Sequence, residues 1–348
     1  MVQKVIDETD KETLAYKYSI TSYGADFTVQ VMVSKLDEEV IFVPRFQRSY
    51  VWNINQASRF IESLLLGLPV PGIFLSREMS TQKLLVIDGQ QRLKSLHYFY
   101  KGVFKEQKFR LKGVQSKFEG QTYDTLAQED KLRLDDAIIH ATIVRQDEPS
   151  DDESSVYHIF ERLNTGGTLL QPQEIRACIY HGGFRELLDE LRNDEDWQRV
   201  YGRPSDRLKD EELILRFLGL YFDFDNYKPP MKEFLNIYMG KNRNFNIQEE
   251  SSLKEAFKPA IRLIAQVLGA RAFRPERTIN AAVYDAVMVG LARRLSSGPI
   301  KDKQRFKTQY NKLLRNSEFI EACKTGTSQE KNVRTRVRKA TEYFHQLK

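Results

Sequence analysis

The stretch of sequence that indicates the fold is Leu84-Leu-Val-Ile-Asp-Gly-Gln-Gln-Arg-Leu93. Its first four residues are apolar and branched, as in strands that lie inside a sheet. Asp88 and Gly89 then turn the chain, and a helix begins with two glutamines and an arginine and continues to Gly102. A buried strand that leads through a glycine turn into a helix predicts a domain that combines a sheet with helices.

The segments on both sides of this stretch continue the alternation of strands and helices. Short apolar runs predict strands at residues 41–43, 73–76, 108–111 and 141–145. Helical patterns cover residues 28–36, 55–67 and 156–163, and Pro172 stands where the first turn of a further helix is expected. The residues before Thr28 are polar and rich in tyrosine, so we interpret residues 1–27 as an N-terminal arm.

The pattern changes near residue 205, where long helical periodicities replace the short strands. These periodicities cover residues 211–222, 253–268, 279–295, 303–323 and 330–347. We therefore expect an α+β protein. A domain with a small mixed sheet, residues 28–200, is followed by an all-helical domain, residues 201–348, that ends in a basic helix.

Composition excludes several classes of protein. The chain has 348 residues and a formal net charge of +6, and residues 301–348 alone hold 13 Lys and Arg against 5 Asp and Glu. The longest apolar stretch, residues 64–75, contains two glycines and two prolines and is too short to span a bilayer. The first residues lack the apolar segment of a secretory signal, and Cys178 and Cys323 form no CxxC pair. We therefore expect a cytoplasmic protein that does not enter the membrane.

The turn after the strand at residues 84–87 has the chemistry of an anion site. Free backbone N–H groups and the positive end of the helix dipole attract anions to a helix N-terminus. Arg92 adds a planar fork that fits phosphate oxygens. Asp88 could hold a divalent cation or orient water. The alternative is that Asp88 caps the helix and Arg92 forms a surface ion pair.

A second cluster precedes this turn. Residues 43–52 combine three aromatic side chains with Arg45, Gln47 and Arg48. Arginines beside aromatic rings are typical of pockets that bind phosphates or stack bases. In the alternative interpretation, the aromatic side chains anchor a loop to the core and the arginines extend into solvent.

A third cluster ends the helix predicted at residues 156–163. Asn164 and the pair Gly166-Gly167 follow this helix, and such a sequence can arrange backbone N–H groups as an anion-binding nest. The same residues can also stop a helix without binding any ligand.

A metal nuclease has little support in the sequence. The five histidines form no HxH or HExxH pattern. The one arrangement of two carboxylates and a lysine that we can offer is Asp88 with Glu106 and Lys108.

The last helix predicted from the sequence has a basic face and an apolar face. The basic face consists of Lys331, Arg334, Arg338 and Lys339. The apolar face consists of Val333, Val337, Ala340 and Phe344. A basic helix of this kind can contact the phosphates of DNA, and the alternative is a solvated terminal helix.

The order of these motifs resembles the N-terminal domain of GmrSD-type restriction endonucleases, which is placed in the ParB/sulfiredoxin-like superfamily. The shared elements are Pro44-x-Phe-Gln-Arg-x-Tyr-x-Trp52, Ile87-Asp-Gly-Gln-Gln-Arg-Leu93 and Arg162-x-Asn-x-x-Gly167. The resemblance covers roughly residues 40–184 and implies a ParB/sulfiredoxin-like fold for that part of the chain.

The resemblance implies a pocket that binds a nucleoside triphosphate and hydrolyses it to license DNA restriction or anti-phage defence. By this similarity, Asp88, Gln90, Gln91 and Arg92 form the phosphate and metal side of the pocket, and Gly89 gives the turn its shape. Mg²⁺ is the metal expected at Asp88.

The resemblance also assigns residues to the opposite side of the pocket. Gln47 and Arg48, with Arg45 beside them, would close over the nucleotide, and Arg48 would neutralise charge on the transferred phosphoryl group. Arg162 and Asn164 are further candidates.

The chain departs from full-length restriction enzymes of this type, which usually carry a His-Asn-His nuclease domain. After His181 the sequence has one histidine, His345. We therefore expect an NTP-hydrolysing switch subunit that acts with DNA and with a separate effector or nuclease, and that could form a homo-oligomer. The alternatives are a sensor that binds a nucleotide or modified DNA without turnover and recruits a partner, and a metal-dependent DNA nuclease.

Overall fold

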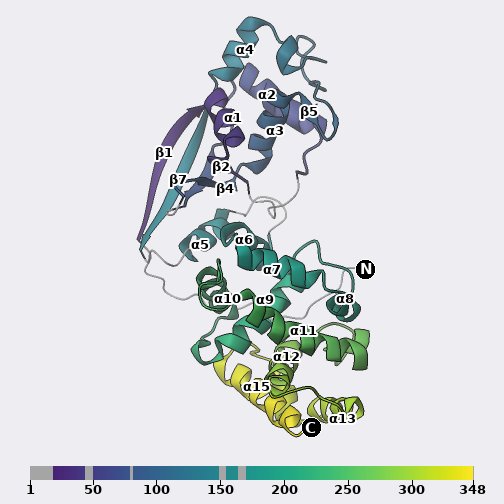
Figure 1. Ribbon diagram of the computed structural model, residues 1–348. Helices are drawn as coiled ribbons and strands as arrows, with labels where there is room; N and C mark the ends of the chain where they lie inside the picture. The colour runs from purple at the N-terminus through teal and green to yellow at the C-terminus, as the bar shows by residue number, and fades with distance from the viewer. Residues whose placement is uncertain (1–18, 44–49, 79–80, 149–153, 164–169, 348) are drawn as a thin grey trace. The chain divides into compact units, whose positions relative to one another are not determined.

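We describe residues 19–43, 50–78, 81–148, 154–163 and 170–347 of a computed structural model of the chain. These residues divide into two compact units, one within residues 17–169 and the other from residue 170 onward (Figure 1). The first unit contains a mixed sheet with helices, and the second is helical, as the sequence predicted. None of the helices among these residues is long and apolar enough to cross a bilayer.

A five-stranded sheet organises the first unit. The strands are β1 (Ser19–Thr28), β2 (Ile41–Phe42), β3 (Ile73–Arg77), β4 (Leu84–Asp88) and β7 (Ile138–Glu148), in the order β1-β7-β3-β4-β2. The pairs β1–β7 and β3–β4 are antiparallel, whereas β3–β7 and β2–β4 are parallel. The sheet is therefore mixed.

The N-terminal part of this sheet differs from the sequence prediction. Residues 19–27, which we expected in an arm, pair with β7 along their whole length. Since Ile20 and Tyr23 are exposed, this strand lacks the buried apolar run that marks an internal strand. The pairing with β7, more than 100 residues away, decides its conformation.

Five helices and a small hairpin complete the first unit. The helices are α1 (Val29–Asp37), α2 (Ile54–Leu65), α3 (Gln90–Lys101), α4 (Gln128–Asp135) and α5 (Ser154–Leu163), with a 3₁₀ turn η1 (Tyr123–Thr125). The hairpin consists of β5 (Val103–Phe104) and β6 (Gln107–Lys108). In α2 the residues that recur at helical spacing are buried, and the helix begins at Ile54, one residue before the predicted start. Asn53 is the N-cap and forms a capping box with Gln56, which fixes this start.

The second unit contains helices and no strand within residues 170–347. Its helices are α6 (Pro172–Ile179), α7 (Gly183–Arg192), α8 (Glu195–Tyr201), α9 (Lys209–Phe222), α10 (Met231–Lys241), α11 (Glu250–Val267), α12 (Ala281–Leu295), α13 (Lys303–Leu313), α14 (Ser317–Ala322) and α15 (Glu330–His345), with 3₁₀ turns η2 (Phe224–Asn226) and η3 (Gly269–Arg271). Helix α12 is the centre of the unit, because every residue from Ala281 to Ala292 is buried. It packs against α9, α11 and α15.

Two features of this unit differ from expectation. The helix predicted at residues 303–323 is broken, because Asn316 caps a new helix by accepting a hydrogen bond from the N–H of Phe319 at 2.9 Å. The units divide after residue 169, whereas we expected the boundary at residue 200. Arg176 of α6 explains the difference: it is 1% exposed and donates hydrogen bonds to Glu212 of α9 at 2.9 Å and to Asn236 of α10 at 2.8 Å.

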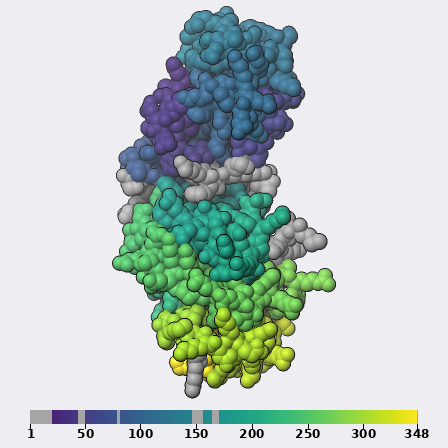
Figure 2. Space-filling model, turned by 45° about the vertical axis from the view of Figure 1, so that its right-hand side comes forward, coloured from purple at the N-terminus to yellow at the C-terminus, as the bar shows by residue number. Residues whose placement is uncertain are grey.

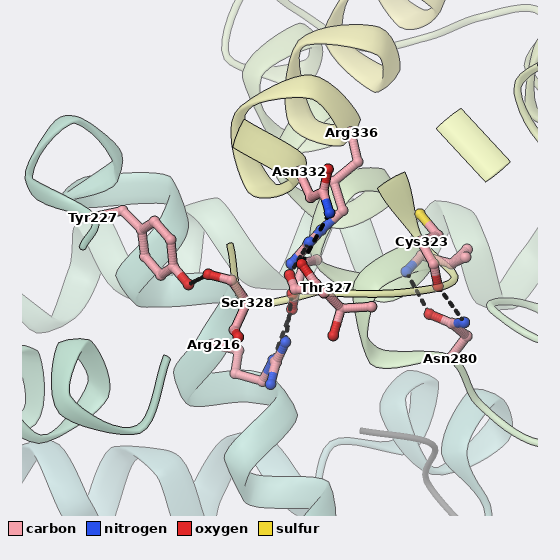
Figure 3. A network of polar contacts seen from close by, with 11 residues as sticks. Arg216, Tyr227, Asn280, Cys323, Thr327, Ser328, Asn332 and Arg336 are labelled. Carbon is pink, nitrogen blue, oxygen red and sulfur yellow. Dashed lines mark hydrogen bonds and ion pairs between the residues drawn. The ribbon is translucent and has the colours of Figure 1, made fainter. Parts of the chain in front are cut away.

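A buried polar network joins α9, α12 and α15 (Figure 3). Asp285 of α12 accepts hydrogen bonds from Arg216 of α9 at 2.8 and 3.1 Å and from Arg336 of α15 at 2.9 Å. Arg336 also donates to the carbonyl of Thr327, and Tyr227 donates to the carbonyl of Ser328. Since Arg336 and Asp285 are 0% exposed, this network fixes α15 in the core of the unit through charge-assisted hydrogen bonds.

Candidate functional site

The junction of β4 and α3 has the local structure that the sequence indicated. Leu84 to Ile87 are buried, and Asp88 ends the strand with a side chain that is 54% exposed. Gly89 then adopts φ +102°, and α3 begins at Gln90 without a side-chain cap. The backbone N–H groups of the first helical turn therefore have no intrahelical acceptor. They form a potential anion site beside Asp88.

Glycine is required at position 89 for two reasons. The positive φ is disfavoured for residues with a side chain. A Cβ atom at this position would also lie 2.4 Å from Cγ2 of Ile73 on β3, well inside van der Waals contact. The turn is thus pressed against the neighbouring strand, and the first turn of α3 is held in place by the sheet.

Arg92 lies under this turn and connects it to the start of β3. Its Nη2 donates to Oδ2 of Asp88 at 2.8 Å and to the carbonyl of Gly72 at 3.0 Å. The side chain is 16% exposed, and its Nε is buried without a hydrogen-bond partner in the described part of the chain. The ion pair that we considered as an alternative is thus present. Gly72 was not recognised from the sequence as part of the site.

The two glutamines of the motif have different environments. Gln90 is 7% exposed. Gln91 extends its side chain to the segment that precedes α2, where its Oε1 accepts hydrogen bonds from the backbone N–H of Val51 at 3.0 Å and of Trp52 at 3.2 Å. The side-chain carbonyl of Gln91 is thus engaged in holding this segment against α3.

The described aromatic residues of the second cluster pack against the same region. Tyr50 forms a hydrogen bond of 2.8 Å with the hydroxyl of Ser95 on α3, and its ring lies edge-on to Tyr98 at 5.1 Å between centroids. The ring of Trp52 lies 5.9 Å from that of Phe60 on α2. These side chains anchor the segment to the core, as in the alternative interpretation of this cluster. Arg45, Gln47 and Arg48 lie outside the described residues.

The third cluster is only partly described. Arg162 is exposed near the end of α5, a helix that packs against β7 and β4, and Asn164 lies outside the described residues. Glu174, which follows this cluster, is 8% exposed and accepts hydrogen bonds from the N–H of Gln171 at 2.6 Å and from Arg207 at 2.7 Å. Glu174 therefore stabilises the start of α6.

The arrangement proposed for a metal nuclease is not formed. Asp88 precedes the first residue of α3, whereas Glu106 and Lys108 belong to the hairpin that follows its last residue (Figure 1). The helix between them is about 18 Å long, at 1.5 Å per residue. This separation is too large for one metal ion, and no group of three metal-ligating side chains occurs in the described part of the chain. Two carboxylates at opposite ends of a helix cannot form the catalytic centre we considered.

The basic face predicted for the last helix is largely paired with carboxylates. Arg334 contacts Glu330 at 2.8 Å, Arg338 contacts Glu342 at 2.6 Å and Lys339 contacts Glu318 at 2.8 Å. Lys331 is exposed. The apolar face is buried as predicted, since Val333, Val337, Ala340 and Phe344 are each 0% exposed. DNA binding by this face remains a prediction.

Comparison with known proteins identifies one family. Residues 29–181 match the family model described as the GmrSD restriction endonuclease, N-terminal domain. The match includes the β4–α3 junction and the segment bound by Gln91, and it confirms the family that the motif order indicated. This part of the chain is thus similar to a restriction endonuclease domain. No curated protein matches the chain.

Proposed function

Because residues 29–181 match the family model of the GmrSD restriction endonuclease N-terminal domain, we propose that the β4–α3 junction binds and hydrolyses a nucleoside triphosphate. The protein then acts as the switch subunit of a prokaryotic restriction or anti-phage defence system. The observation that carries this proposal is the glycine turn before the N-terminus of α3, with Asp88 and Arg92 beside it.

The phosphates bind to the first turn of α3. The N–H groups of Gln91 and Arg92 donate to phosphate oxygens, and the helix dipole adds a favourable field. Gly89 shapes the turn before these N–H groups, because its φ of +102° is disfavoured for a residue with a side chain. The hydrogen bonds of Arg92 to Asp88 and Gly72 both use Nη2, so the guanidinium can donate to a phosphate oxygen through another nitrogen.

Asp88 fits a metal that arrives with the nucleotide. Its carboxylate is half-exposed at the edge of the phosphate site. Protein sites for Mg²⁺ often use one or two carboxylates together with substrate phosphates, so one aspartate is sufficient. When bound, Mg²⁺ supplies neutralisation of charge on the phosphates. In its absence, Asp88 accepts from Arg92 and keeps the guanidinium next to the helix N-terminus.

Gln91 acts by positioning. Its hydrogen bonds to the N–H groups of Val51 and Trp52 fix the segment that follows Arg45, Gln47 and Arg48 in the sequence. By the resemblance to the family motif, Gln47 and Arg48, with Arg45 beside them, would close over the nucleotide, Asn164 is a further candidate, and Arg48 would neutralise charge on the transferred phosphoryl group. DNA and a separate effector or nuclease are the expected partners.

A phosphate-release screen tests this proposal. Purified protein is incubated with ATP, GTP, CTP or UTP and Mg²⁺, with and without duplex DNA. We expect release with at least one nucleotide and a loss of at least about tenfold in Arg92→Ala, since removal of one donor to a developing charge commonly costs more than that. Asp88→Asn is a second variant. Because the side chain of Asp88 is half-exposed, we expect this substitution to lower phosphate release without unfolding the protein. Arg133→Ala is the matched control, because Arg133 lies on α4 and pairs only with the exposed Glu129 among described residues.

The outcomes separate the two functions that remain. Release by Arg92→Ala at the rate of Arg133→Ala would exclude the proposed site. Binding without release would favour the sensor that recruits a partner. Absence of both binding and release would overturn both functions.

A further inference from the structure

The positive charge of the C-terminal 48 residues is not distributed as the sequence suggested. On α15, the cations Arg334, Arg338 and Lys339 each lie within 2.8 Å of a carboxylate oxygen. Exposed ion pairs contribute little net potential, because the two charges cancel at a distance. Most of the free positive charge must therefore lie on another element.

Helix α13 and its two flanks carry that charge. All six of its cations are exposed, and none has an ion-pair partner among the described residues; they are Lys301, Lys303, Arg305, Lys307, Lys312 and Arg315. No acidic residue occurs from Lys303 to Asn316. The nearest one, Asp302, caps the helix by accepting from the N–H of Arg305 at 2.8 Å. The other exposed residues of the helix are Gln304, Thr308 and Asn311, which can also donate hydrogen bonds.

The opposite face of α13 fixes the orientation of this basic surface. Phe306, Tyr310 and Leu313 are buried, and the ring of Phe306 lies 5.6 Å from that of Phe344 on α15. The hydroxyl of Tyr310 accepts a hydrogen bond of 3.0 Å from the N–H of Phe273. The helix is held by its apolar side, so the cations face solvent. The surface containing these residues lies in the yellow-green part of Figure 2.

We propose that the exposed face of α13, with Lys301 and Arg315 at its ends, binds the phosphate backbone of duplex DNA. This proposal depends on the proposed function in one respect, namely that DNA is a partner of the protein. It assigns the contact with DNA phosphates to α13 instead of α15. An α-helix of 11 residues is about 17 Å long, which matches about five base pairs of B-DNA. Lysine and arginine without a neighbouring carboxylate are suited to neutralise phosphates, and binding of this kind is independent of sequence.

The composition of α13 favours DNA over an anionic membrane. Helices that lie on a membrane insert an apolar face between the lipid head groups. The large apolar side chains of α13 are instead buried within the helical unit. What remains exposed is polar and basic, and this surface is complementary to a phosphate backbone rather than to acyl chains.

The test measures binding of the full chain to a labelled 30-base-pair duplex by fluorescence anisotropy at several NaCl concentrations. The α13 variant combines Lys303→Gln, Lys307→Gln and Lys312→Gln. The α15 variant removes the same charge by combining Lys331→Gln, Arg334→Gln and Arg338→Gln. The matched control removes three exposed cations outside residues 301–348, by combining Arg203→Gln, Lys228→Gln and Lys241→Gln.

The expected effect follows from the release of counterions. The association constant varies as the salt concentration to the power of about −0.9 per phosphate contact, so each lost contact costs roughly fivefold at 0.15 M salt. We expect the α13 variant to bind about 100-fold more weakly, with a slope of log K against log salt that is less steep by about 2.7. The α15 variant and the control should each change affinity by less than about fivefold.

Four other outcomes would overturn the assignment of DNA binding to α13. A loss in the α15 variant equal to that in the α13 variant would restore the contact to α15. An equal loss in the control would mean that only net charge matters. Absence of duplex binding by the unmodified chain, or binding to phosphatidylserine vesicles instead, would also exclude it. Anisotropy is measured without nucleotide, so failure of NTP hydrolysis in the separate phosphate-release assay leaves this result unaffected.

Discussion

Replacement of Gly89 by alanine is the most direct test of the β4–α3 junction as a tightly built turn. The residue has φ +102°, and the added Cβ would lie 2.4 Å from Cγ2 and 2.9 Å from Cβ of Ile73. The same helix offers a matched control at its other end. Gly102 has φ +70°, and a Cβ atom added there would meet no heavy atom within 4 Å among the described residues. Both substitutions place a Cβ at positive φ, with Gly89 further from the allowed left-handed region than Gly102, and only Gly89→Ala adds a clash.

The expected losses in the free energy of unfolding follow from the backbone strain and from the clash with Ile73. Left-handed backbone conformation costs a residue with a Cβ about 1–2 kcal/mol. Insertion of a methyl group into a packed contact costs a further 1–3 kcal/mol or so, because β3 and α3 must move apart. We therefore expect Gly102→Ala to lower the free energy of unfolding by about 1–2 kcal/mol and Gly89→Ala to lower it by about 2–5 kcal/mol.

Urea unfolding followed by tryptophan fluorescence measures this difference. The chain has two tryptophans, so a Trp197→Phe background leaves Trp52, which packs on Phe60 in the same unit as α3. Gly89→Ala should also weaken nucleotide binding more than Gly102→Ala, because the first turn of α3 is displaced from the sheet. Equal losses of stability in the two variants would refute the argument that β3 presses against this turn.

Two further predictions concern the helical unit. Asp285→Asn removes the carboxylate that pairs with two buried arginines, so it should lower the free energy of unfolding by about 3–5 kcal/mol. Urea unfolding followed by Trp197 fluorescence measures this loss, and Asp206→Asn, at an exposed position, is the control. A loss below about 1 kcal/mol in Asp285→Asn would contradict the role of the network. Burial raises the pKa of the Cys178 and Cys323 thiols to about 12, so at pH 8 about one molecule in 10⁴ carries the thiolate at either site. In the folded protein, neither cysteine thiol should react with a disulfide reagent within minutes at pH 8, whereas both thiols should react in urea. Rapid reaction of the folded chain would contradict the burial of these two side chains.

The elements that were predicted well are those whose determinants lie close together in the sequence. The helix from Gln90 to Gly102 was recognised with its ends, because a left-handed glycine stands at each of them. Pro172 does occupy the first turn of α6. The aromatic residues Tyr50 and Trp52 were considered as anchors, and they pack as such. Periodicity and turn chemistry act within a few residues, so a single sequence contains them.

The elements that were predicted poorly depend on distant partners. Residues 19–28 become a strand because β7 supplies their hydrogen bonds. Helices α6 to α8 belong to the helical unit because buried side chains such as Arg176 find their acceptors on α9 and α10. A local pattern does not reveal such pairings, since neither partner is unusual in its own stretch of sequence.

The sequence by itself determined the strand–glycine–helix motif, the order of the motifs and the concentration of positive charge near the C-terminus. Only the tertiary structure decided which groups remain available for ligands. It engaged the side-chain carbonyl of Gln91, paired Arg92 with Asp88, and neutralised three cations of α15 while it left those of α13 exposed. The physical reason is that the availability of a charge depends on the groups within a few ångströms of it. Folding brings those groups from distant parts of the chain.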